Sequence, residues 1–158
     1  MANTQSMCTS FLGELMTATH NFGASPVRAA STADTVKAAL YLASATLNAS
    51  TTVYSATGEV TGTNYTAGGV TVTNATAPTS TNSSTTAGVG YWTPSASIVY
   101  TNVTLSTSFD TVFLYNSTQS NKSISVHTFT AQTITAGTFT LTMPTNSTTN
   151  ALIRLATT

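Results

Sequence analysis

The chain of 158 residues contains very few charged side chains, four Lys or Arg and four Asp or Glu, which is 5% of the sequence. Globular domains usually carry about 25% charged residues. The basic residues stand singly at Arg28, Lys37, Lys122 and Arg154. Binding of nucleic acid through its phosphates, or recruitment to an anionic membrane, needs clustered Lys and Arg. The composition therefore argues against nucleic acid and membranes as direct partners.

Cysteine and long apolar runs are scarce too. The single cysteine, Cys8, excludes an intramolecular disulfide, and because no neighbouring residue would activate its thiol, we expect a small buried or incidental thiol. The first residues, MANTQSM, lack the basic and apolar regions of a secretory signal. No apolar stretch is long enough to span a bilayer. We therefore expect a protein that is made and folded in a cytoplasm.

Residues that would support catalysis are also sparse. The two histidines, His20 and His127, lie far apart, and the sequence has no Gly-x-Ser-x-Gly elbow, no zinc-ligand spacing and no phosphate-binding loop. The best carboxylate pair for glycoside hydrolysis is Glu59 and Asp110, which would have to converge in the fold. We expect no enzymatic activity, no cofactor and no metal, and a glycan-active enzyme assembled from remote residues is the alternative.

Hydroxyl side chains take the place of the missing charges, with 38 Thr and 19 Ser besides 11 Asn. The chain is nevertheless 41% hydrophobic and has no net charge, whereas disordered chains combine low hydrophobicity with high net charge. A domain of this length buries about two thirds of the surface of its unfolded chain. The composition predicts one folded domain with a single core.

One short helix is predicted near the N-terminus. Phe11, Leu12, Leu15 and Met16 share a face at helical spacing, and a serine precedes them as a cap. A helix of about three turns needs docking to persist. We assign residues 1–34 to this helix and an arm or loop, and we take its apolar face as a candidate assembly arm that reaches a neighbouring subunit.

From residue 35 onward the hydrophobic period changes to two, which is typical of strands. Strands are predicted at residues 35–43, 70–73, 91–92, 98–105, 111–116, 123–130, 138–143 and 151–155. The first should bury one face, residues 111–116 should be covered on both faces, and Ala136 and Gly137 should form a turn. About eight short strands predict an all-β fold, an antiparallel β-sandwich of the jelly-roll or immunoglobulin-like kind. This domain spans residues 35–158 and includes a long polar loop at 75–90.

Two features suggest a binding surface. Tyr65, Tyr91 and Trp92 lie beside glycine-rich sequence and are a candidate protein or glycan contact, or else the cap of the core. The repeated Thr-x-Thr pairs are similar to the flat threonine arrays of ice-binding proteins. Strand alternation in a threonine-rich chain produces such pairs in any case, and their irregular spacing argues against an ice-binding face.

Residues 37–78 and 109–144 carry five marks, ALY, YSATGEV, GTNYTAGG, LYNST and AGTFTLTMP. Together these stretches resemble a recurrent pattern in small structural proteins of tailed bacteriophages. The resemblance implies a non-enzymatic capsid decoration, or cement, protein on the exterior of the virion. It would bind and stabilise the lattice of the major capsid protein and associate with copies of itself as a homo-oligomer. A phage tail, fibre or head-to-tail component, including a glycan-binding adhesion module, is the alternative.

Overall fold

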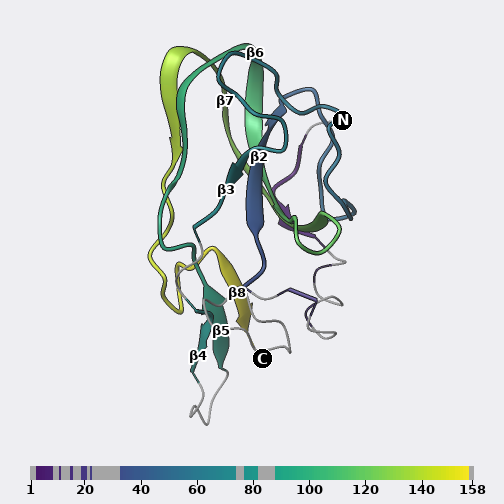
Figure 1. Cartoon of the computed structure of the whole chain (residues 1–158). Coiled ribbons are helices and arrows are strands. Elements are labelled where there is room, and N and C mark those ends of the chain that lie inside the picture. The colour runs from purple at the N-terminus through teal and green to yellow at the C-terminus, as the bar shows by residue number, and fades with distance from the viewer. Residues whose placement is uncertain are drawn as a thin grey trace.

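The computed structural model describes residues 3–8, 11, 15, 19–20, 22, 33–73, 77–81 and 88–156. Its strands form two antiparallel sheets, with the orders β1-β7-β6-β2-β3 and β4-β5-β8 (Figure 1). The strands are β1 (Ser6–Met7), β2 (Val36–Leu42), β3 (Val70–Thr71), β4 (Thr79–Ser80), β5 (Val89–Trp92), β6 (Ile98–Asn116), β7 (Lys122–Leu141) and β8 (Ile153–Ala156). The all-β prediction is therefore confirmed. Among these residues no helix is long and apolar enough to cross a membrane.

The largest element is a hairpin of β6 and β7, which are 19 and 20 residues long. Each strand replaces two shorter strands that the sequence predicted, so the predicted strand breaks were wrong. Ala136, with a φ of 46°, and Gly137 do not turn the chain but lie inside β7, where Gly137 is opposite Val103 and the register shifts. The positive φ and the shifted register are those of a β-bulge, which kinks a strand without ending it.

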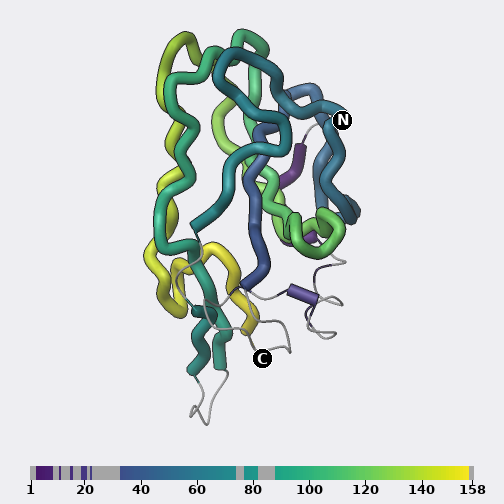
Figure 2. Tube along the Cα trace, in the orientation of Figure 1, coloured from purple at the N-terminus to yellow at the C-terminus, as the bar shows by residue number. Residues whose placement is uncertain are grey.

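The hairpin folds over at one end of the molecule, so that its two halves lie in two layers (Figure 2). We call residues 98–105 of β6 with residues 134–141 of β7 the outer leg. The other half, which ends at the hairpin turn, pairs with β2 in the five-stranded sheet. The outer leg crosses back over this sheet, and the hydroxyl of Tyr100 donates a 2.7 Å hydrogen bond to the Ala38 carbonyl of β2.

An aromatic core lies where the hairpin folds over. The ring of Phe109 is 5.7 Å from Phe129 and 5.4 Å from Phe139, both nearly edge to face. Tyr100 extends this cluster, with its ring 6.0 Å from Phe139. Such contacts between aromatic rings add to the area that they bury, so the fold of the hairpin is held by side chains from both of its halves.

The strand predicted at residues 35–43 is β2, but it buries both faces rather than one. Its consecutive residues Ala38, Ala39, Leu40 and Tyr41 are all fully buried. The outer leg covers one face, and the loop between β2 and β3 covers the other, where Tyr54 stacks 4.6 Å from Tyr115. The prediction that residues 111–116 are covered on both faces is confirmed, since all six are buried.

The described N-terminal residues belong to the chain's own sheet and core. β1 pairs with β7, placing Ser6 and Met7 opposite Val126 and Ser125. Of the four apolar residues of the predicted helix, Phe11 and Leu15 have helical backbone, whereas Leu12 and Met16 lie outside the described residues. Phe11 is fully buried against His20 and Phe22, with ring distances of 4.8 and 5.8 Å.

The smaller sheet lies at the end of the molecule opposite the fold of the hairpin (Figure 1). The two residues of β4 fall within the long loop predicted at 75–90, where they pair with Tyr91 and Gly90 of β5. Trp92 of β5 is paired with Ile153 of β8, and both side chains are buried. The buried thiol expected for Cys8 is confirmed.

Candidate functional site

Glu59 is a buried carboxylate, 7% exposed, on the loop that covers one face of the five-stranded sheet. Gly58, with a φ of 81°, turns the chain just before it. Glu59 then lies opposite Tyr41, and the Val60 amide donates a 3.0 Å hydrogen bond to the Leu40 carbonyl. These pairings fix the Glu59 backbone against β2, so its side chain is held beside the tyrosines that line this face.

Three donors converge on the Glu59 carboxylate. The Tyr54 hydroxyl donates to Oε2 at 2.6 Å, and the Tyr65 hydroxyl and the Gly68 amide each donate to Oε1 at 2.7 Å. Hydrogen bonds to an ionised acceptor are shorter and stronger than bonds between neutral groups, and the three distances here are short. We call Glu59, Tyr54, Tyr65 and the Gly68 amide the Glu59 cluster. It ties three points of one loop to a single buried side chain.

The tyrosine hydroxyls also complete the hydrogen bonding of the backbone around this loop. Tyr65 accepts a 3.0 Å bond from the Leu40 amide at the same time as it donates to Glu59. The Tyr115 hydroxyl donates to the Gly68 carbonyl at 2.8 Å, and the Tyr41 hydroxyl donates to the Ser55 carbonyl. Buried backbone groups must be paired, and here side chains pair the groups that no strand reaches.

Two adjacent glycines allow the loop to approach β2 this closely. A Cβ on Gly69, whose φ is 70°, would lie 1.7 Å from the Ala38 carbonyl oxygen. Gly68 has a φ of 85°, a conformation that strains residues with a side chain. The Gly68-Gly69 pair therefore marks both a turn and a close contact between the loop and β2.

Burial raises the pKa of the tyrosines around Glu59 well above the usual range. Desolvation is the largest cause for Tyr41, Tyr54, Tyr65 and Tyr100, and the nearby charge of Glu59 adds to it. These phenols stay protonated and act as hydrogen-bond donors. A general base or nucleophile needs the opposite, a pKa close to the working pH. The phenols of the Glu59 cluster thus act as hydrogen-bond donors that hold the loop in place.

The structure does not bring the three predicted contact residues together on one surface. Tyr65 belongs to the Glu59 cluster, and its ring stacks 5.9 Å from Tyr100. Trp92 is 2% exposed and packs 4.6 Å from Phe22. Tyr91, on β5, is partly exposed. Of the three, Trp92 alone is buried, whereas Tyr65 and Tyr91 are both partly exposed, on different parts of the fold.

The carboxylate pair considered for glycoside hydrolysis is held by separate partners. Asp110 accepts hydrogen bonds from the Asn3 amide at 2.8 Å and the Thr111 hydroxyl at 2.7 Å, neither of which touches Glu59. A third carboxylate, Asp34, accepts a 2.8 Å bond from the Asn116 amide. Each of these carboxylates therefore serves a local contact of its own.

His127 and Ser125 form a hydrogen-bonded pair on β7, with Nε2 and Oγ 2.8 Å apart. Desolvation lowers the pKa of His127 to about 4. Within the described part of the chain, no carboxylate bonds to the other ring nitrogen to orient the imidazole, as a hydrolytic triad requires. The described residues also contain no group of three His, Cys, Asp or Glu placed to hold a metal ion.

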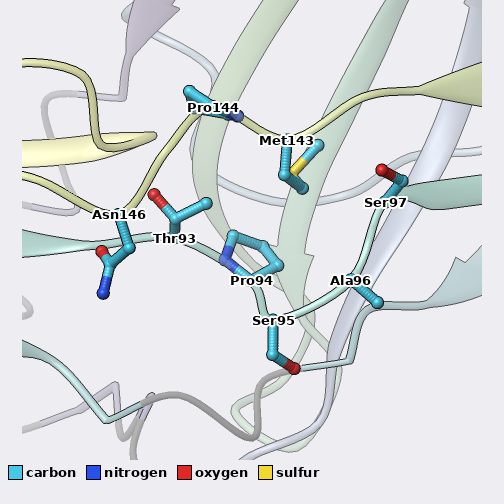
Figure 3. A pocket seen from close by; sticks show the side chains of 8 residues that line it. All are labelled: Thr93, Pro94, Ser95, Ala96, Ser97, Met143, Pro144 and Asn146. Carbon is cyan, nitrogen blue, oxygen red and sulfur yellow. The ribbon is translucent and has the colours of Figure 1, made fainter.

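A shallow hollow lies between the segment that follows β5 and the segment that follows β7 (Figure 3). It is lined by Thr93, Pro94, Ser95, Ala96, Ser97, Met143, Pro144 and Asn146. The lining has neither a charged group nor an aromatic ring on which a sugar could stack.

Comparisons of the chain with family models, curated proteins and solved structures found no match. Function must therefore be argued from the residues themselves.

Proposed function

We propose that this chain is a non-enzymatic structural protein of a phage particle, a capsid decoration protein that binds and stabilises the lattice of the major capsid protein. The observation that carries the proposal is the uncharged, hydroxyl-rich surface of the outer leg. Exposed residues of this part of β7 include Thr135, Thr138 and Thr140, and no charged residue occurs among residues 123–153.

A neutral sheet surface of this kind suits packing against large, fixed neighbours. Ionised side chains lose much of their hydration energy when they are buried at an interface, whereas hydroxyls lose less and can form hydrogen bonds across it. Weak repulsion between copies allows dense packing on a lattice. Binding to the folded state then stabilises both subunit and shell by mass action. The partners in this proposal are the major capsid protein and further copies of the chain, on the exterior of the virion.

The resemblance to phage structural proteins supports the same function, and the role requires no catalytic residue, cofactor, nucleic acid or membrane. We also propose that the layers form a jelly-roll or immunoglobulin-like sandwich with a short N-terminal helix. Of the candidate assembly arm, Phe11 is fully buried and Leu15 partly buried in their own subunit, and Leu12 and Met16 lie outside the described residues.

Quantifying the chain in purified virions tests this proposal. We expect copies in a fixed ratio to the major capsid protein, located over the capsid lattice in an electron cryomicroscopy map. We also expect capsids stripped of the chain to rupture at lower temperature and to regain stability when it is added back. A few copies at the tail would instead favour the tail or fibre function, and their absence from the particle would refute a virion role.

A further inference from the structure

The outer leg leaves one edge of a sheet without a partner strand. β1 pairs with Ser125 and Val126 only, and no other described strand pairs with that side of β7. From Thr130 to the end of the strand, β7 pairs with β6 on one side and with no described strand on the other, and we call this side its open edge. Figure 1 shows this yellow-green part of β7 along one side of the molecule. The amide and carbonyl groups of an open edge can pair with another extended chain.

This edge lacks most of the features that normally protect sheet edges. Natural edge strands carry Lys, Pro, inward-pointing charges or bulges that prevent pairing. Residues 123–153 include no Lys, Arg, Asp or Glu, and β7 contains no Pro. The bulge at Ala136 and Gly137 interrupts the strand, but beyond it the register is regular, with Phe139 to Leu141 opposite Tyr100 to Ile98. A regular, neutral stretch of edge is therefore available.

An apolar hollow lies next to the same stretch. It has a volume of about 390 Å³ and is lined by Phe129, Thr130, Ala131, Gln132, Phe139, Thr140 and Leu141. The rings of Phe129 and Phe139, 5.0 Å apart, contribute aromatic surface to it. None of the lining residues is charged. A strand added to the edge of β7 would cover this hollow and remove apolar surface from water.

We propose that residues 138–142, which are the last four residues of β7 and Thr142 after it, pair in antiparallel fashion with the same residues of a second copy of this chain. Antiparallel pairing of two identical segments is self-complementary about a two-fold axis, so one edge provides both halves of the interface. Identical edges that carry no charge meet without repulsion, and this edge offers no charge that would select an oppositely charged partner. The pairing joins the outer legs of two subunits into one continuous sheet. It rests on the proposed function, in which copies of the chain associate with one another.

Sedimentation equilibrium with two matched lysine variants tests this pairing. Thr140 and Val99 are directly opposite each other on neighbouring strands of the outer leg, and both are exposed. Lysine at position 140 lies on the edge and repels its symmetry mate, whereas lysine at position 99 lies one strand further from the axis. We expect the wild-type chain and Val99→Lys to dimerise alike and Thr140→Lys to dimerise about fivefold more weakly or worse. A monomeric wild-type chain, or equal weakening by both variants, would overturn the proposal.

Cysteine cross-linking locates the contact independently of affinity. In Thr138→Cys, Thr140→Cys and Thr142→Cys, the position nearest the two-fold axis should form an intermolecular disulfide under mild oxidation, because facing Cα atoms in an antiparallel pair lie within disulfide range. Val99→Cys is the control and should remain monomeric on a non-reducing gel. The native Cys8 is fully buried and stays in place. Cross-linking of Val99→Cys as readily as of the β7 variants would contradict the pairing.

Failure of the pairing and failure of the proposed function give different results. A wild-type chain that dimerises through residues 138–142 but does not bind capsids supports the pairing and refutes the decoration function. A monomeric wild-type chain that binds capsids in a fixed ratio refutes the pairing and supports decoration. Circular dichroism spectra of each variant establish that it is folded before either measurement is interpreted.

Discussion

Replacing Glu59 with alanine should be among the most destabilising single changes in the loop between β2 and β3. The substitution leaves three donors, the hydroxyls of Tyr54 and Tyr65 and the amide of Gly68, without their acceptor. The partly exposed Tyr54 can turn to water, but the Gly68 amide is buried and Tyr65 is held by its bond to the Leu40 amide. Each buried donor left unpaired costs about 1 to 3 kcal/mol. With the small cavity, we expect Glu59→Ala to lower the free energy of unfolding by about 3 to 5 kcal/mol.

Three milder variants separate the hydrogen bonds from the charge. Glu59→Gln keeps an acceptor oxygen for Tyr65 and Gly68 and places its amide donor at the Tyr54 hydroxyl, which can rotate to accept. We expect it to cost about 1 to 2 kcal/mol. Tyr65→Phe removes a donor to Glu59 and also the acceptor of the Leu40 amide, whereas Tyr54→Phe removes only a donor. Tyr65→Phe should therefore be the more destabilising of the two.

Equilibrium unfolding in urea at neutral pH, followed by far-ultraviolet circular dichroism and tyrosine fluorescence, measures all four variants against the wild-type chain. The expected order of stability is wild type, then Glu59→Gln, then Glu59→Ala, with Tyr54→Phe above Tyr65→Phe. A loss of less than about 1 kcal/mol for Glu59→Ala would show that water replaces the carboxylate without cost, and the cluster would then not hold the loop. Equal losses for Glu59→Gln and Glu59→Ala would show that the charge, not the hydrogen-bond geometry, matters.

Three further predictions test other parts of the fold. Burial lowers the pKa of His127 from 6.5 to about 4, so the unfolded chain takes up this proton at a higher pH than the folded chain. The free energy of unfolding should therefore fall by about 2 to 3 kcal/mol as the pH drops from 6.5 to 4. In urea titrations, His127→Gln should make the free energy of unfolding depend less on pH. Gly69→Ala should cost more than about 2 kcal/mol, while Gly90→Ala, with no atom closer than 3.9 Å to the added Cβ, should change the melting temperature little. Trp92→Ala should cost about 3 to 5 kcal/mol as a core truncation, and Tyr91→Ala less than about 1 kcal/mol; equal effects would contradict the placement of their side chains.

Several strands could be predicted because their signal is local. Alternating apolar residues located β2, and a run of apolar residues located the buried end of β6. The continuity of β6 could not be predicted, because residues 106–108 are polar and exposed where the hairpin folds over. Polar residues between two apolar runs are typical of a turn, but this segment lies within β6, because Leu105 and Phe109 on either side of it pair with Ile134 and Gln132 of β7. Gly137 gave the same false turn signal, since a bulge and a turn both favour glycine.

The Glu59 cluster had a sequence signal that pattern reasoning did not use. Glu59 is the only charged residue between Lys37 and Asp110, and it lies between two tyrosines five residues before and six residues after it. A single charged residue in so long a neutral stretch indicates a side chain held by specific partners, because a solvent-exposed segment usually carries several charged residues. Because Tyr54 and Tyr65 lie within six residues of Glu59 in the sequence, hydrogen bonds between them and Glu59 could be suspected from the sequence. The contribution of Tyr115 depends on the pairing of β6 with β2 and could not be inferred.

The scarcity of charge is greater on the surface than the composition suggests. Asp34 and Glu59 are buried, and Asp110 is partly buried; all three accept hydrogen bonds from side chains within the fold. The carboxylates of the described residues thus pair internal donors and add little to the field around the molecule. Solubility then depends on the hydroxyls of Thr and Ser, which hydrate a surface but do not repel a second copy. A chain of this kind has little electrostatic protection against self-association, so an ordered contact between copies, such as the open edge of β7 offers, limits the ways in which they associate.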